Sequence, residues 1–136
     1  MPESLWINLP VKDVNLSRDF FTQIGFKLNT QYGNSEHSAS FFVGKMVVMF
    51  FNEATFKSFT RNELADTKIG TEVLFSIEAA SKEDVDEIAK KVSEAGGTVF
   101  SPPAESQGWM YGCAFSDLDG HRWNSLYMDM SKMPQG

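Results

Sequence analysis

Few side chains in this sequence suit metal or nucleophilic chemistry. The 136 residues include one cysteine, Cys113, and two histidines, His37 and His121. One cysteine permits neither an intrachain disulfide nor a metal site with several thiolates. Cys113 stands in an apolar run typical of a strand, so we interpret it as a small buried hydrophobic residue. His37 stands in a polar loop and His121 follows a turn glycine, so we expect loop or turn roles for both.

Large aromatic side chains form the second group that bears on chemistry: Trp6, Trp109, Tyr111 and Trp123. Aromatic walls with a few fixed polar groups make pockets for small molecules. The alternative is that these residues fill the core, cover a sheet edge or form a dimer contact. A net charge of −6 and a pI near 4.8 argue against nucleic acid or an anionic membrane surface as a partner, because both need a positive surface. A neutral or cationic small ligand fits this charge better.

The length and composition predict one domain spanning residues 1–136, since 42% of the residues are hydrophobic and the chain is too short for two ordinary domains. The first residues have no basic region followed by a long apolar core, and no apolar run approaches the roughly 18 residues of a membrane helix. We therefore expect a soluble, cytoplasmic protein without a membrane partner.

The elements that would position these side chains occur in two similar series. In the first, an alternating strand from Ser4 to Val11 precedes a helix with Asp13 as its N-cap. Leu16, Phe20 and Ile24 form its predicted apolar stripe, and Gly25 ends it. A strand at 26–30, a turn at 32–35 and a hairpin around Gly44 follow. The predicted order is β-α-β-β-β over residues 4–52.

The second series follows a polar connection at 53–70, in which we expect one helical turn, and covers residues 71–128. A strand at 71–77 leads to Ser81-Lys82-Glu83-Asp84, which resembles a capping box. The helix after it ends at Gly96-Gly97, and its predicted apolar stripe is Val85, Ile88, Ala89, Val92 and Ala95. A strand at 98–100 is expected to break at Ser101-Pro102-Pro103. A hairpin with the turn Asp117-Leu118-Asp119-Gly120 then completes a second β-α-β-β-β series.

A tandem β-α-β-β-β pair of this length resembles the vicinal oxygen chelate superfamily, which includes glyoxalase I, bleomycin-resistance and fosfomycin-resistance proteins, and extradiol dioxygenases. Two stretches carry the resemblance, namely residues 7–21, from Ile7 to Phe21, and residues 115–123, from Phe115 to Trp123. Leu118 replaces the proline that is usual in the second. The resemblance implies an α+β fold in which the two modules form a cupped mixed sheet that holds the ligand.

In the superfamily's metal enzymes, the first and last strands of each module supply the ligands of a divalent ion. Matching these positions selects Trp6, Val48, Glu72 and Asn124 in this chain. Val48 and Asn124 each stand four residues after a turn glycine. This set offers one carboxylate, one amide and two side chains unsuited to a hard or borderline cation. We therefore expect no metal and no other cofactor.

Three hypotheses remain open from the sequence. In the first, the protein binds a small aromatic or cationic molecule through Trp6, Val48, Glu72, Trp109, Tyr111 and Asn124. In the second, it is a divergent glyoxalase-like lyase or dioxygenase-like enzyme with Glu72 as general base or sole carboxylate ligand. In the third, it is an interaction module that works through a dimer surface containing several of its methionines. The resemblance also implies a homodimer.

Overall fold

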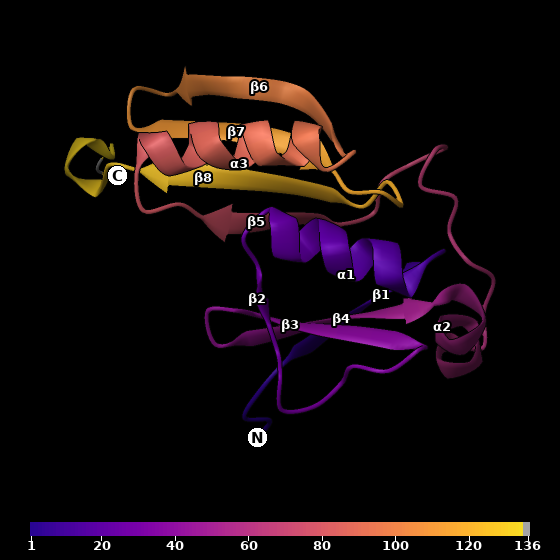
Figure 1. Cartoon of the computed structure of the whole chain (residues 1–136). Coiled ribbons are helices and arrows are strands. Elements are labelled where there is room, and N and C mark those ends of the chain that lie inside the picture. Colours follow the sequence, from indigo (N-terminus) through magenta and orange to yellow (C-terminus); the bar gives the residue numbers. More distant parts are fainter. Residues whose placement is uncertain (135–136) are drawn as a thin grey trace. The chain divides into compact units, whose positions relative to one another are not determined.

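The computed structural model of the chain describes residues 1–134 (Figure 1). Contacts within the chain divide it into two units, with the boundary in the sequence between Asp66 and Thr67. The elements of the first unit are β1 (Trp6–Val11), α1 (Val14–Gln23), β2 (Lys27–Leu28), β3 (Ser38–Val43), β4 (Met46–Asn52) and α2 (Glu53–Thr60). Those of the second are β5 (Leu74–Glu78), α3 (Lys82–Glu94), β6 (Thr98–Ser106), β7 (Met110–Ser116), β8 (Arg122–Met128) and a 3-10 helix, Met130–Lys132. The predicted α+β class and tandem order are confirmed.

The first unit packs α1 against one face of a sheet with strand order β1-β4-β3-β2. Strands β1 and β4 are parallel, and the other two pairs are antiparallel. Asp13 caps α1 as predicted, because its side chain accepts a hydrogen bond from the backbone N of Leu16. The ring of Phe21 on α1 stacks on Phe50 of β4, with 4.4 Å between centroids. Leu16, expected in the apolar stripe, is instead 57% exposed; Val14 and Ser17 are buried in its place.

A loop covers part of the opposite face of this sheet. Asn29 is fully buried, and its Oδ1 accepts hydrogen bonds from the backbone N of Gln31 and of Tyr32. Tyr32 stacks on Trp6 of β1, with 5.8 Å between centroids. A Cβ at Gly33 would lie 2.6 Å from Cβ of Ser40. The turn expected at residues 32–35 is therefore part of a longer loop held against β3.

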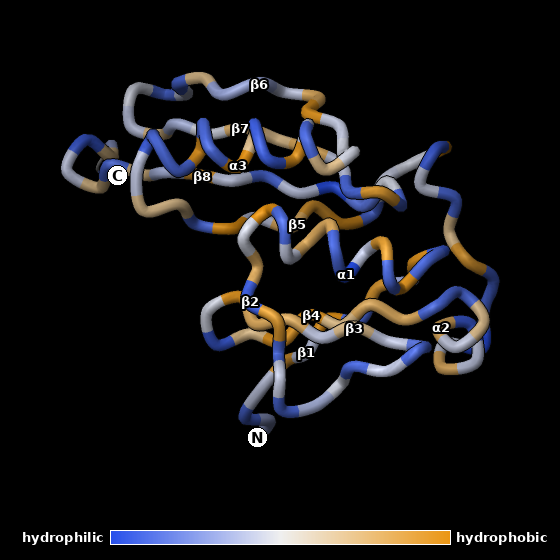
Figure 2. The backbone as a smooth tube through the Cα atoms, in the orientation of Figure 1, coloured by the Kyte–Doolittle hydropathy of each residue, from blue (hydrophilic) through white to orange (hydrophobic). Residues whose placement is uncertain are grey.

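The second unit repeats this plan with strand order β5-β8-β7-β6 and α3 on one face. Ser81 caps α3 by accepting a hydrogen bond from the backbone N of Asp84, which confirms the predicted helix start. Val85 and Val92 of the predicted stripe are fully buried. Figure 2 shows the hydrophobic and hydrophilic residues alternating along α3. Val85, Ala89 and Cys113 form a buried cluster between this helix and β7.

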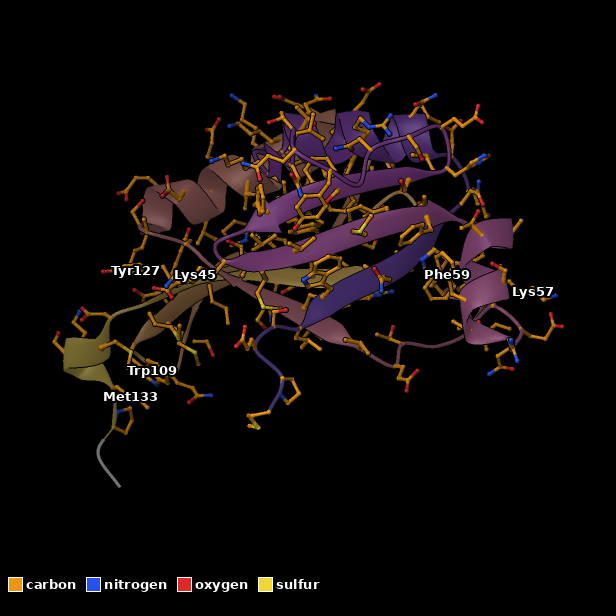
Figure 3. The ribbon with its side chains drawn as sticks, turned by 90° about the horizontal axis from the view of Figure 1, so that it is seen from below. Lys45, Lys57, Phe59, Trp109, Tyr127 and Met133 are labelled. Carbon is orange, nitrogen blue, oxygen red and sulfur yellow. The ribbon has the colours of Figure 1, made fainter. Side chains whose placement is uncertain are left out.

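Two expectations about connecting segments were wrong. Pro102 and Pro103 do not end the strand that begins at Thr98, because β6 is an edge strand in which missing N–H groups are tolerated. Instead the β6–β7 register shifts on either side of Ser101. The polar connection contains the full helix α2 rather than one turn. Phe59 of α2, labelled in Figure 3, packs edge-to-face on Phe51 of β4. No helix within residues 1–134 is long and apolar enough to cross a membrane.

Candidate functional site

A hollow of about 420 Å³ lies on the face of the second sheet that points away from α3. We call this the open face. Strand pairing assigns its residues: Asn124 lies opposite Ala114 of β7 and Ser76 of β5. The neighbouring residues Cys113, Phe115 and Trp123 belong to the other face and are almost fully buried. The open face is thus the side of this sheet on which side chains remain partly accessible.

Small side chains along β7 create the hollow. After Met110, the open-face residues of this strand are Gly112, Ala114 and Ser116, and Ser101 and Ala104 of β6 pair with the same strand. A Cβ at Gly112 would lie 2.5 Å from Cδ2 of Leu126 and 2.8 Å from the carbonyl oxygen of Ser125. Leu126 therefore lies over the glycine and forms a wall. Together with Met110 and Pro102 it gives the hollow an apolar lining.

Asn124 contributes a polar group to this lining. Its Oδ1 is buried and accepts no hydrogen bond from any residue in the part of the chain that the structure describes. An unsatisfied buried acceptor costs about 1–3 kcal/mol. Such a group in a hollow is suited to accept a hydrogen bond from a ligand.

Arg122 lies two residues before Asn124, at the start of β8 and on the same face. Its guanidinium carbon lies 4.2 Å from the ring centroid of Phe100 on β6. Because β7 separates β8 from β6, the Arg122 side chain extends across the small residues of β7. Its Nε is buried without a hydrogen-bond partner among residues 1–134. Arginine and asparagine thus present a donor and an acceptor side by side.

The turn before β8 is fixed by Asp117, which is 5% exposed. Its Oδ1 accepts hydrogen bonds from the backbone N of Asp119 and of His121, and its Oδ2 accepts one from Nε1 of Trp123. Burial raises the pKa of the Asp117 carboxyl, and the nearby His121 and these hydrogen bonds oppose that rise. The aspartate therefore holds the register of β8 and, through it, the positions of Arg122 and Asn124.

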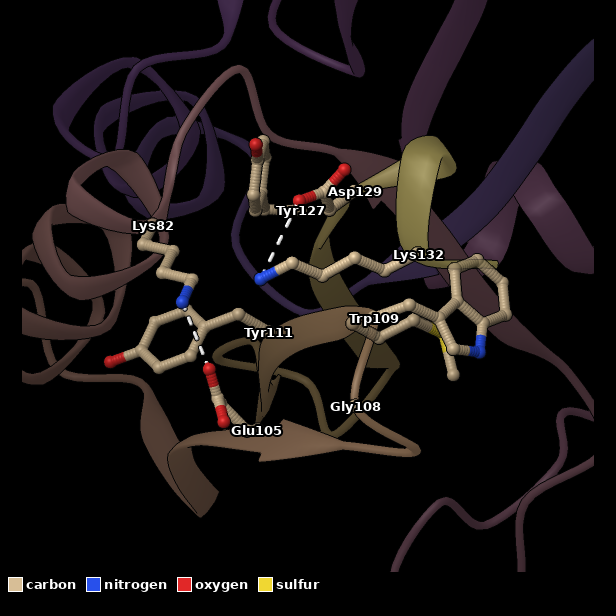
Figure 4. A pocket seen from close by; sticks show the side chains of 9 residues that line it. Lys82, Glu105, Gly108, Trp109, Tyr111, Tyr127, Asp129 and Lys132 are labelled. Carbon is tan, nitrogen blue, oxygen red and sulfur yellow. Dashed lines mark hydrogen bonds and ion pairs between the residues drawn. The ribbon is translucent and has the colours of Figure 1, made fainter. Parts of the chain in front are cut away.

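Trp109 and Tyr111 come together in a separate, smaller cavity at the end of the sheet (Figure 4). Tyr111 points to the helix face, where its hydroxyl donates a 2.6 Å hydrogen bond to Oδ1 of Asp86. Lys82 lies over the Tyr111 ring and pairs with Glu105 at 2.9 Å. The cavity has about 20 Å³ of space, close to that of a single water. Trp109 and Tyr111 thus line a different surface from Asn124.

Trp6 and Val48 belong to the first unit and lie on opposite faces of its sheet. Val48 is 3% exposed and pairs with Phe41, whose ring lies beside Phe21 of α1. It therefore belongs to the helix-facing core rather than to a ligand surface. Trp6 is 51% exposed, and on its face β4 contributes Val47 and Met49. Counting four residues from the turn glycine reaches the second residue after the closing pair in both hairpins, but the pair Val43–Met46 lies on the helix face and the pair Ser116–Arg122 on the open face.

Glu72 precedes β5 and is exposed, so it is not part of the second sheet. Ser76 occupies the β5 position opposite Asn124. The side chains at the positions selected by the family resemblance do not fit a divalent cation, because the Trp6 indole offers only an N–H donor and Val48 is apolar. No cluster of three or more histidine, cysteine, aspartate or glutamate side chains suited to a metal occurs within residues 1–134.

Arg122 was missed as a candidate from the sequence. The signal was available: Arg122, Asn124 and Leu126 alternate along one strand, so a charged residue shares the face of the proposed asparagine. The small residues at alternate positions of β7 were a second signal, because they predict a depression in the middle of a sheet.

Comparison with known proteins places this architecture in a family. The model of the Glyoxalase/Bleomycin resistance protein/Dioxygenase superfamily matches residues 4–124. The chain belongs to this superfamily. The resemblance inferred from residues 7–21 and 115–123 is therefore confirmed. A comparison with curated protein sequences finds no significant match.

Solved structures agree with the superfamily assignment. The hypothetical protein SA1046 from S. aureus is 35% identical, with a TM-score of 0.83 over 93% of this chain and 95% of that one. A superfamily enzyme from Burkholderia phytofirmans shares the fold at 19% identity, with a TM-score of 0.77 over 90% and 96% of the two chains. The fosfomycin resistance protein FosX from Listeria monocytogenes also shares the fold, at 18% identity. Its TM-score is 0.67 over 96% of this chain and 97% of that one.

Proposed function

We propose that this superfamily member binds a small organic molecule in the hollow on the open face of its second sheet, without a metal held by the usual ligand set. The observation that carries the proposal is the hollow itself, which lies over the small residues of β7 and has the unpaired Oδ1 of Asn124 in its lining. A cavity of a few hundred Å³ with apolar walls and a few fixed polar groups is typical of small-molecule sites.

The test is a thermal-shift screen of small organic molecules, repeated on an Ala114→Leu variant. Ala114 lines the hollow and is half-buried, so a larger side chain there fills the space without displacing the helix-facing core. A ligand at 100 times its Kd stabilises the native chain by about 2.7 kcal/mol, and this gain should vanish in the variant.

The matched control is Ala54→Leu, which adds the same side chain at an exposed position of α2 in the other unit. Hits should keep their full shift in this variant. Compounds that shift Ala114→Leu and Ala54→Leu as much as the native chain would bind outside the hollow and contradict the proposal.

The binding residues in this proposal are Asn124, Ala114, Leu126 and Met110, which line the hollow, and Arg122, which lies beside it on the same face of β8. Trp6, Trp109 and Tyr111 lie outside the hollow and stay untested as ligand contacts. The role of Glu72 as a catalytic base stays a prediction of the enzyme hypothesis. A homodimer and a cytoplasmic location also stay predictions, to be tested by light scattering and by fractionation.

A further inference from the structure

The geometry points to a carboxylate as the group by which the ligand is recognised, with Arg122 as its anchor and Asn124 as the acceptor for a second, hydrogen-bond-donating group. This inference rests on the proposed function and specifies the chemical class of the molecule that the hollow takes.

The first argument is the state of Arg122. No carboxylate within residues 1–134 forms an ion pair with it, and no hydrogen bond from its guanidinium is formed there. Arg18, by contrast, donates hydrogen bonds to Asn15 and to the carbonyl oxygens of Ser35 and Ser38. Arg122 is thus a half-buried cation whose donors are unused by the described chain.

The second argument is the contact with Phe100. The Phe100 ring holds the guanidinium carbon 4.2 Å from its centroid and offers the guanidinium no oxygen acceptor. The N–H groups of a guanidinium lie in its plane, where they match the two oxygens of a carboxylate. Phe100 immediately precedes Ser101, which lines the hollow, so Arg122 and Phe100 adjoin the ligand space. A planar oxyanion is therefore the group that this arginine is suited to bind.

The third argument is the spacing of Arg122 and Asn124. Residues two apart on one face of a strand are separated by about 7 Å. The Oδ1 of Asn124 can only accept, so it requires a hydroxyl or N–H group on the ligand. Leu126 and Met110 would contact the apolar part of the molecule. The class is thus a small organic acid with an apolar body and a donor group several atoms from its carboxylate.

The charge near the hollow differs from that of the whole chain. The net charge of −6 favoured a neutral or cationic ligand. However, Glu105, a carboxylate in the lining of the hollow, is bound to Lys82, which lowers the pKa of Glu105 and raises that of Lys82. Glu78 lies on β5 opposite Leu126 and is exposed. The unpaired charge next to the small residues of β7 is that of Arg122.

The experiment compares three probes of similar shape by calorimetry: 4-hydroxyphenylacetate, its neutral amide 4-hydroxyphenylacetamide, and the cation tyramine. We expect the carboxylate to bind at least about tenfold more tightly than the amide, because a charge-assisted pair with arginine is stronger than a neutral hydrogen bond. Tyramine should bind most weakly.

Three variants assign the effect. Arg122→Gln should abolish the preference for the carboxylate over the amide, and Arg122→Lys should retain part of it because the charge remains. Asn124→Leu should weaken the binding of 4-hydroxyphenylacetate. It should leave the binding of phenylacetate, which lacks the hydroxyl, unchanged. Circular dichroism checks that each variant is folded, and Arg122→Lys preserves the test if Arg122→Gln does not fold.

The outcomes separate this inference from the proposed function. Equal or tighter binding of the amide or of tyramine, lost in Ala114→Leu, would overturn the carboxylate assignment and leave the binding site standing. The same holds if none of the three probes binds but other screened compounds do. If no compound binds in a manner that depends on Ala114, both proposals fail.

Discussion

The indole Nε1 of Trp123 donates a 3.1 Å hydrogen bond to Oδ2 of Asp117 inside the second unit. The same carboxylate accepts the backbone N–H groups of Asp119 and His121, so three donors share one buried residue. This arrangement ties the turn between β7 and β8 to the core beneath it. It also fixes which residues of β8 lie on the open face.

We predict that Asp117→Ala lowers the free energy of unfolding by about 2–4 kcal/mol, because three donors lose their acceptor and the Trp123 indole is buried. Urea denaturation measures the change. Leu118→Ala in the same turn is the control, since Leu118 is 41% exposed and should change the free energy by no more than about 0.5–1 kcal/mol. Similar losses in both variants would show that the turn is not held by the carboxylate.

Gly112→Ala tests the close contact between β7 and β8. The new Cβ would lie 2.5 Å from Cδ2 of Leu126 and 2.8 Å from the backbone oxygen of Ser125, which cannot give way as a side chain can. We expect a loss of about 1–3 kcal/mol in thermal or urea unfolding, as for overpacked sites. Gly70→Ala is the matched control, because a Cβ added at Gly70 would have no neighbouring atom within 4 Å. A stable Gly112→Ala protein would mean that Leu126 is free to move away.

Asn29→Leu tests the loop over the first sheet. The change keeps a side chain of similar size but removes the acceptor for Gln31 and Tyr32 and the donor to Ser40. We expect a destabilisation of about 1–3 kcal/mol and faster amide exchange at these two backbone groups. Exchange measured by NMR would refute this role if residues 31 and 32 kept their protection.

The pair of Tyr111 and Asp86 predicts a pH dependence. The hydrogen bond to Asp86 raises the pKa of the Tyr111 phenol above its ordinary value of 10.0. The pKa of Tyr111 is therefore higher in the folded chain than in the unfolded chain. The stabilisation from this difference is present below about pH 10 and is lost as the pH rises through the pKa of the folded state. In Asp86→Asn the tyrosinate absorbance of Tyr111, measured with Tyr32 and Tyr127 replaced by phenylalanine, should appear at lower pH. An unchanged titration would mean that the bond does not persist in solution.

Elemental analysis of purified protein tests whether the chain binds a divalent metal. We expect no stoichiometric divalent metal and no saturable thermal shift with Zn²⁺, Mn²⁺ or Fe²⁺, because the side chains at the family positions are poor ligands for these ions. One equivalent of metal that is lost in Glu72→Gln would favour the enzyme hypothesis instead.

Local sequence features determined the elements of this protein. These features act within a few residues of the chain: the caps Asp13 and Ser81, the glycines after α1 and α3, and the turns at Gly44 and Gly120. The tandem order and the superfamily could therefore be inferred from the sequence alone. The predicted strand break at Pro102 failed because whether a strand lies at an edge depends on its partners, and β6 has β7 on one side only.

The tertiary structure decided which side chains form the site. Val48 and Asn124 both stand four residues after a turn glycine, but the pair that closes the first hairpin lies on the helix face and the pair that closes the second lies on the open face. Because side chains alternate along a strand, a difference of one residue in register reverses the face. The contact of Arg122 with Phe100 likewise depends on strand order, since it spans a strand that lies between them. Local sequence features thus determined the tandem order of the elements, whereas strand pairing between distant segments determined the candidate site.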